Sequence, residues 1–201
     1  QRQMCIRDRT CSHGHSLLVH PVCLKKVLEH PEKIGFLDIE TSNLVATYGY
    51  VFSYCIKEMD GDILEGCITK EDLESGVFDK KLIHNLIRDM KKFDRLVTYY
   101  GTSFDIPFLR TRAIKYKLDF PLYKEIQHTA LYSVVKNRCK LHSNRLGVVC
   151  DFFNIKAKGH PLKPKVWFKA SMGEPKALQY ILTHNREDVI STEKLYKRVI
   201  L

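Results

Sequence analysis

The stretch Ile34-Gly35-Phe36-Leu37-Asp38-Ile39-Glu40-Thr41 decides the fold of this chain. An apolar run of strand length ends there in two acids that alternate with isoleucine. Side chains along a strand point to opposite faces in turn, so Asp38 and Glu40 share a face. In the middle of a sheet covered by helices, two such carboxylates would repel each other and lose hydration, at several kcal/mol per ion. A divalent metal ion between them would remove that cost.

The Asp-x-Glu pattern alone does not decide the matter. Asp60 and Asp62 have the same spacing in ordinary hydrophilic surroundings, as do Asp72 and Glu74. The case for a metal site therefore depends on other parts of the chain.

Size and composition indicate one α/β domain with a short appendage. The chain has 201 residues, of which 44% are hydrophobic, enough for a sizeable core. No apolar run is long enough to cross a bilayer, and no signal peptide is recognisable, so we predict a cytoplasmic protein with no membrane partner. The seven cysteines are irregularly spaced, which favours free buried thiols over a disulfide framework.

The charge of the chain favours an anionic partner. Lys and Arg number 33 against 23 acids, which gives a formal net charge of +10. A basic surface attracts polyanions, nucleic acid above all, although many basic proteins bind none.

Residues 1–32 differ from the rest and are interpreted as a lead-in to a domain at 33–201. The first nine residues, QRQMCIRDR, resemble translated adapter sequence, so the start of the lead-in is not treated as native. The remainder is either a locally folded lead-in or a small segment that binds structural Zn²⁺. Its four candidate ligands are Cys11, His13, His20 and Cys23.

Hydrophobic periodicity predicts the order of elements. Three consecutive strands with short turns imply an antiparallel meander, and the later strand-and-helix order implies an α/β domain with a mixed sheet. The predicted strands cover 33–40, 45–57, 63–69, 96–100 and 125–129. The predicted helices cover 22–30, 79–92, a segment opened by Pro107, a segment after Ser143, and 174–201, with a basic loop at 156–169.

Two further stretches carry candidate functional residues. In Thr98-Tyr99-Tyr100-Gly101-Thr102-Ser103-Phe104-Asp105-Ile106-Pro107, a strand ends and a turn delivers Asp105 to the start of a helix. Ligands of open α/β sheets gather at such places. This stretch taken alone favours Asp105 as the cap of the helix, a role that can coexist with ligand binding. In His184-Asn185-Arg186-Glu187-Asp188, His184 and Asp188 are four residues apart and lie on one helix face.

The three stretches together resemble the DEDD superfamily of 3′-5′ exonucleases, which has the ribonuclease H-like fold. The similarity covers roughly Lys33 to Lys197 and is greatest to predicted exonucleases related to the proofreading domains of family B DNA polymerases. The resemblance implies that four carboxylates hold two Mg²⁺ or Mn²⁺ ions for a two-metal hydrolysis of phosphodiester bonds. Those carboxylates are Asp38, Glu40, Asp105 and Asp188.

The chain departs from the family pattern in its third motif. One branch has Tyr-x-x-x-Asp there and the other His-x-x-x-x-Asp, whereas this chain combines the first spacing with the second residue type at His184. We expect His184 to lie beside the attacking water as a general base or an orienting group. His128, where relatives often have Asp, is not expected to be catalytic.

Substrate contacts are expected at Thr41, Gly101 and Phe104, with Phe104 alternatively a core residue. The lysines of the 156–169 loop either follow a phosphate backbone or are simply solvated. Trp167 is expected to be a buried anchor.

The resulting prediction is a metal-dependent 3′-5′ exonuclease acting on the 3′ end of single-stranded DNA or RNA. An endonuclease on the same fold and an inactive nucleic-acid-binding module remain the alternatives. A role within a larger repair, recombination or mobile-element assembly is also open.

Overall fold

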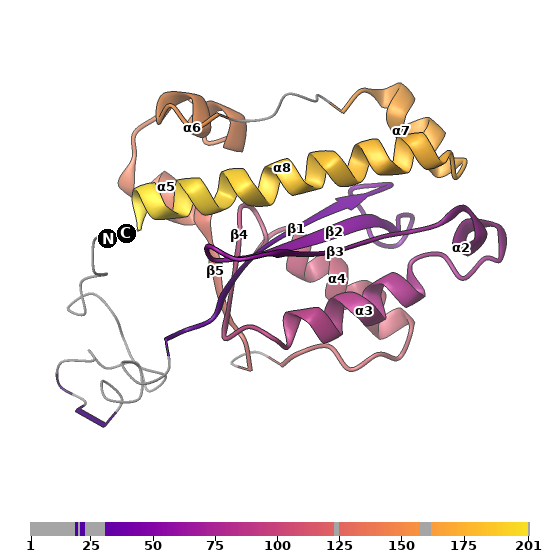
Figure 1. Cartoon of the computed structure of the whole chain (residues 1–201), viewed down its shortest axis with the longest axis horizontal. Coiled ribbons are helices and arrows are strands. Elements are labelled where there is room, and N and C mark those ends of the chain that lie inside the picture. Colours follow the sequence, from indigo (N-terminus) through magenta and orange to yellow (C-terminus); the bar gives the residue numbers. More distant parts are fainter. Residues whose placement is uncertain (1–18, 20, 23–30, 123–124, 157–161, 201) are drawn as a thin grey trace.

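The computed structural model describes residues 19, 21–22, 31–122, 125–156 and 162–200. These residues form a mixed β-sheet with helices on both faces (Figure 1). The strands are β1 (Ile34–Thr41), β2 (Val51–Glu58), β3 (Ile63–Cys67), β4 (Arg95–Thr98) and β5 (Gln127–Ala130). The helices are α2 (Lys70–Glu74), α3 (Lys80–Met90), α4 (Asp105–Lys115), α5 (Leu131–Arg138), α6 (Leu146–Phe152), α7 (Pro164–Ser171) and α8 (Pro175–Val199).

Strand β1 lies at the centre of the sheet, whose order is β3-β2-β1-β4-β5. It pairs antiparallel with β2 and parallel with β4, and β2–β3 and β4–β5 continue the two patterns. The predicted fold class, a three-strand antiparallel meander followed by parallel strands in a five-stranded mixed sheet, is confirmed. The parallel pairing of β1 with β4 runs only from Ile34 to Phe36. The last residues of β1 therefore extend beyond that ladder.

The alternation of side chains along β1 separates two layers. Leu37 and Ile39 pack in a core cluster with residues of α3 and α4. Ile34 and Phe36 pack in a second cluster with α5, α6 and α8, and the ring of Phe36 lies 5.5 Å from that of Tyr196. Because Asp38 and Glu40 have the parity of Phe36, they face α8, which crosses the sheet as the long yellow helix of Figure 1.

Helix α4 is held against α3 by a buried ion pair. The guanidinium of Arg112 donates to the carboxylate of Asp79, and both side chains are nearly inaccessible. Asp79 also accepts hydrogen bonds from the Val51 amide at 2.8 Å and from the Tyr116 hydroxyl. This cluster fixes α4 relative to the start of β2.

Several predicted boundaries differ from the structure. The second strand begins at Val51 instead of residue 45, because Asn43 accepts from the Val45 amide and the Val45 carbonyl accepts from Tyr48 and Gly49, which closes a turn. Thr69 ends no strand; it forms a capping box that starts α2. The prediction of a basic loop at 156–169 is wrong from Pro164 onward, where Pro164 begins helix α7.

Other expectations have mixed outcomes. Cys55, Cys67, Cys139 and Cys150 are free thiols, as predicted. The zinc ligands expected at Cys11, His13, His20 and Cys23 and most of the helix expected at 22–30 lie outside the described residues, so the division at residue 33 stays a prediction. Within the described part of the chain, no helix has the length and apolar character needed to span a membrane.

Candidate active site

Acidic and imidazole groups meet where the carboxyl end of β1 faces the middle of α8. Among the described residues, Glu40, His184 and Asp188 each offer a ligand atom within 4.8 Å of the others. His184 Nε2 lies 3.7 Å from Glu40 Oε1 and 3.9 Å from Asp188 Oδ2. The four-residue spacing places His184 and Asp188 one turn apart on the helix face that covers the sheet.

A tight turn between β4 and α4 brings Asp105 to the same region. The Gly101 amide donates to Thr98 Oγ1 at 3.0 Å, and a Cβ at Gly101 would lie only 2.0 Å from that oxygen. Gly101 is therefore needed for the close approach of the turn to Thr98. Asp105 is the first residue of α4, and Phe104 occupies the N-cap position. The alternative reading of Asp105 as the helix cap is thus not what the structure shows.

The pKa of Asp105 is raised to about 7, chiefly because burial removes its carboxyl group from water. Backbone amides of Asp105 and Ile39 lower the pKa, and the charge of Asp188 raises it. The interaction with Asp188 places the two carboxylates in one electrostatic environment. A neighbouring divalent cation would favour the charged form of both.

Asp38 is held by a residue that the sequence analysis did not single out. Asn185 Nδ2 donates to Asp38 Oδ2 at 2.7 Å, and Asn185 is completely buried. Two consecutive residues of α8 thus contact the two acids of β1: His184 lies beside Glu40, and Asn185 donates to Asp38. No spacing rule indicated Asn185, because neighbouring helix residues do not share a face and the contact depends on how α8 crosses β1.

The donor set fits a hard divalent cation. Carboxylate oxygens are the ligands that Mg²⁺ and Mn²⁺ prefer, and three of the four predicted carboxylates, with His184, are linked here by distance or by charge. The fourth, Asp38, is two residues from Glu40 on the same strand face and is oriented by Asn185. The structure therefore brings the five predicted residues into one region of the molecule.

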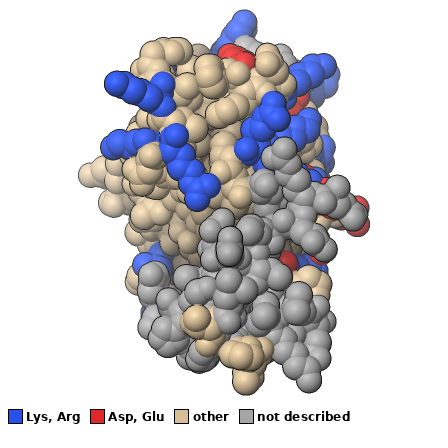
Figure 2. All heavy atoms as spheres, turned by 90° about the vertical axis from the view of Figure 1, so that its left-hand side faces the viewer, with Lys and Arg blue, Asp and Glu red and all other residues tan. Residues whose placement is uncertain are grey.

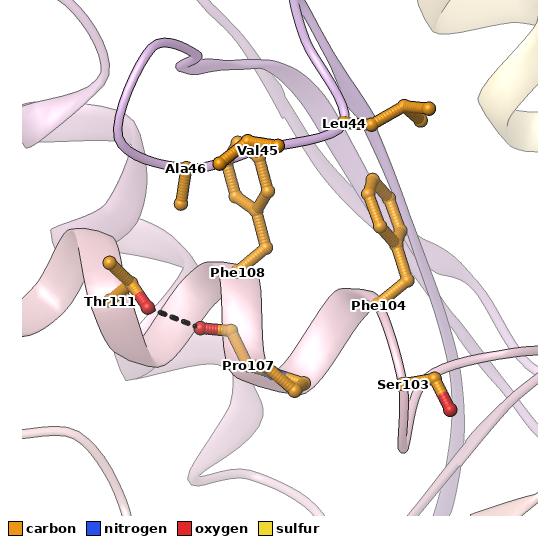
Figure 3. Close-up of a pocket in the computed structure, with 8 residues that line it drawn as sticks. All are labelled: Leu44, Val45, Ala46, Ser103, Phe104, Pro107, Phe108 and Thr111. Carbon is orange, nitrogen blue, oxygen red and sulfur yellow. Dashed lines mark hydrogen bonds between the residues drawn. The ribbon is translucent and has the colours of Figure 1, made fainter.

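An apolar pocket of about 180 Å³ opens between α4 and the loop that follows β1 (Figure 3). Phe108 on α4 and Phe104 directly before the helix point toward Leu44 and Val45 on the loop. Phe104 directly precedes Asp105, and the loop begins after Thr41, whose hydroxyl donates to the Asn43 carbonyl at 2.8 Å. The remaining lining residues are Ala46, Ser103, Pro107 and Thr111.

Two residues mentioned in the sequence analysis have structural roles. His128 shares a hydrogen bond of 2.9 Å with Thr98 Oγ1, and burial lowers the pKa of its imidazole. Trp167 was expected to be a buried anchor; its ring packs against the core, 5.5 Å from that of Phe52, but is only partly buried.

Comparison with known proteins identifies the family. The sequence model of the RNase H superfamily matches residues 35–200. A DNA polymerase of Methanocaldococcus jannaschii is 40% identical over 47 residues, which is 23% of this chain and 3% of that protein. The family B DNA polymerase from the hyperthermophilic archaeon Pyrobaculum calidifontis has a similar fold, with a TM-score of 0.68 and 19% identity over 84% of this chain and 24% of the polymerase.

The chain thus spans only a small part of either polymerase, and the structural likeness concerns the fold. The family match, in contrast, extends from the start of β1 to the end of α8 and supports a nuclease function. Sheet topology and sequence agree, and the chain belongs to the RNase H superfamily.

Proposed function

We propose that this protein is a metal-dependent 3′-5′ exonuclease that hydrolyses phosphodiester bonds of single-stranded DNA or RNA. The observation that carries the proposal is the meeting of Glu40, His184 and Asp188 within 4.8 Å. Asp105 is buried beside them, and burial together with the charge of Asp188 raises the pKa of Asp105. These residues come from β1, α4 and α8, which are far apart in the sequence. A structural ion pair would need one acid and one base, whereas this region concentrates acids.

Asp38, Glu40, Asp105 and Asp188 would hold two Mg²⁺ or Mn²⁺ ions. Bound ions of this kind make water a stronger nucleophile at neutral pH and stabilise charge on a phosphoryl group. Asn185 keeps the Asp38 carboxylate in one orientation. His184, which faces both Glu40 and Asp188, is placed to orient a water molecule or to accept its proton.

The apolar pocket supports recognition of a strand end. Its lining includes Phe104 and Val45, which lie directly before Asp105 and shortly after Thr41. Aromatic side chains bind bases by stacking without strong preference for one base. One base held in this pocket would place its phosphate near the acids, which suits removal of terminal nucleotides.

The matched relatives are both DNA polymerases by name, which supports a nucleic acid substrate. The net charge of +10 supports the same substrate class. Action within a larger repair or mobile-element assembly remains part of the proposal.

The test is digestion of 5′-labelled single-stranded DNA and RNA in the presence of Mn²⁺. We expect a ladder of products shortened from the 3′ end, and we expect none from Asp105→Asn or Asp188→Asn, which keep side-chain size but remove a ligand charge. Circular single-stranded DNA should be spared, since it has no end. Cleavage of the circle would indicate an endonuclease, and equal cleavage by wild type and both variants would refute the assignment of the site.

A further inference from the structure

A surface made of α5, α6 and the carboxyl-terminal end of α8 carries exposed cations outside the candidate active site. This basic face comprises Lys136, Lys140, Arg145, Lys194 and Arg198, all of which are exposed. Figure 2 shows Lys and Arg side chains gathered over the upper part of this side of the molecule, with few acids among them. Between residues 131 and 156 there are five Lys and Arg against the single acid Asp151.

These cations are available to a partner. Among the described residues, no carboxylate lies within ion-pair distance of any of the five, whereas many other lysines and arginines form such pairs. The neighbouring Glu193 is buried and is occupied by Lys57 and Lys197. The positive charge of the face is therefore not neutralised from within.

Hydrogen bonds join the elements of the basic face to one another and to the turn that leads to the candidate active site. Arg138 Nη1 donates to the Val199 carbonyl at 2.9 Å, which joins α5 to the end of α8. The hydroxyl of Tyr99 donates to the Asn144 carbonyl, so the residue before Arg145 is tied to the turn that leads to Asp105. Along α8, Arg198 lies ten residues beyond Asp188, about 15 Å at the usual rise of 1.5 Å per residue.

Two aromatic rings lie on the segments that carry the acids and the cations: Tyr100 on the turn that leads to Asp105, and Tyr132 on α5 with Lys136. Tyr100 is 49% exposed, and its ring centre lies 4.9 Å from that of Tyr132 at the start of α5. Surfaces that bind single strands combine backbone cations with aromatic rings on which bases stack.

We propose that the basic face binds the part of the substrate strand that lies on the 5′ side of the nucleotides in the active site. This inference rests on the proposed nuclease function and adds a second contact region, which matters only for strands that are long enough to reach it. Binding there is electrostatic and releases the counterions condensed on each neutralised phosphate. The free energy gained by that release falls as the salt concentration rises, so binding weakens with salt.

The test compares two triple variants of the full chain that lose the same charge. Lys136→Gln/Lys140→Gln/Arg145→Gln alters the basic face, and Lys80→Gln/Lys115→Gln/Lys176→Gln alters exposed lysines on α3, α4 and the start of α8. Fluorescence anisotropy in EDTA measures binding of labelled oligo(dT) of roughly 30 nucleotides between about 50 and 200 mM salt. A tetranucleotide, cleaved in Mn²⁺, reports whether the active site remains folded.

For the basic-face variant we expect about tenfold weaker binding of the long strand near 0.1 M salt, and a salt slope smaller by about 2, since each single-strand phosphate contributes about 0.7. The control triple should bind as wild type does, and both should cleave the tetranucleotide normally. Equal loss in both triples, or no binding by wild type, would overturn the inference. If the basic-face variant alone loses long-strand binding and neither wild type nor any variant cleaves the tetranucleotide, the nuclease proposal is refuted, whereas binding of a single strand by the basic face stands.

Discussion

Asn185 determines how Asp38 is presented to the candidate site. The amide is completely buried, and its 2.7 Å hydrogen bond to Asp38 Oδ2 occupies one lone pair of that carboxylate. Because Asn185 is held in α8, this hydrogen bond fixes the direction in which the Asp38 carboxylate points. Removal of a group that orients a metal ligand in this way typically weakens metal binding by about 10- to 100-fold.

We expect Asn185→Ala to weaken Mn²⁺ binding by about 10- to 100-fold, because Asp38 loses the hydrogen bond from Asn185 that orients its carboxylate. Isothermal titration calorimetry of the protein with Mn²⁺ measures this directly, without substrate. The matched control is Gln179→Ala, an exposed residue on the same helix, which should bind Mn²⁺ like wild type. Unchanged affinity in Asn185→Ala would show that Asp38 needs no such support.

The sequence could predict site residues that share a face of a single strand or helix, because their spacing shows it. Asp38 and Glu40 were readable from the period of a strand, and His184 and Asp188 from the period of a helix. Asn185 was not readable, because its contact depends on the angle at which α8 crosses β1. The raised pKa of Asp105 could not be predicted either, since it results from burial and from the charge of Asp188, which is distant in the sequence but close in the fold.

At the level of elements, α4 owes its position to the buried Asp79–Arg112 pair. Arg112 is 3% exposed and Asp79 is inaccessible, so removal of one charge leaves the other buried without an opposite charge beside it. Because Asp105 is the first residue of α4, the pair also holds one wall of the candidate site.

Arg112→Met should lower the free energy of unfolding by about 3 to 5 kcal/mol, the usual cost of breaking a buried ion pair from one side. Urea denaturation followed by circular dichroism measures the loss. Arg110→Met serves as the control, since Arg110 lies on the same helix but is exposed; its guanidinium carbon lies 5.5 Å from the centre of the Phe120 ring. A loss in Arg112→Met no larger than in the control would mean that packing, not the pair, holds α4.

Glu193 links α8 to the turn between β2 and β3. Its carboxylate accepts from the Asp60 amide and from Lys197 Nζ, each at 2.8 Å, and lies 3.3 Å from Lys57 Nζ. Burial by itself would raise the pKa of Glu193, but Lys197, the Asp60 amide and Lys57 outweigh it and lower the pKa below its ordinary value of 4.5. The carboxylate is therefore more stable in the folded chain than in the unfolded one.

We expect Glu193→Gln to reduce stability at neutral pH by about 1 to 3 kcal/mol, because charge-assisted hydrogen bonds are lost. A lowered folded-state pKa contributes stability above the unfolded value and loses it as the pH falls through the folded value. The difference between wild type and variant should accordingly shrink below about pH 4.5. Urea titrations at several pH values measure it; a difference that does not change with pH would exclude this charge effect.

Helices with a regular apolar periodicity were predicted well, whereas boundaries that are set by turns were not. Helix α3 and helix α8 lie within about two residues of their predicted bounds, because each has one continuous apolar face. The start of β2 was placed too early, since Val45 and Tyr48 are strand-forming residues that the Asn43 turn keeps out of the sheet. Helix α7 was hidden within a lysine-rich segment that resembled a loop.

For the molecule as a whole, the candidate site joins parts that fold from distant segments. Glu40 lies on the central strand, Asp105 on the layer of α3 and α4, and Asp188 on the layer of α8. A cation held by all three would therefore connect the sheet to the helices on both of its faces. In the absence of a cation, burial of these acids works against the folded state: burial above all, and in addition the charge of Asp188, raises the pKa of Asp105.

Two opposite effects on the melting temperature follow from this arrangement. At about 100 times its dissociation constant, Mn²⁺ should stabilise wild type by about 2.7 kcal/mol, since it binds the folded chain alone. For a domain of this size that corresponds to a rise of about 5 to 10 °C. In EDTA, Asp188→Asn should melt at or above the temperature of wild type, because one repelling charge is gone, and Mn²⁺ should raise it far less. Differential scanning calorimetry with Mn²⁺ and with EDTA tests both effects. An equal Mn²⁺ shift in wild type and Asp188→Asn would mean that the ion binds elsewhere on the molecule.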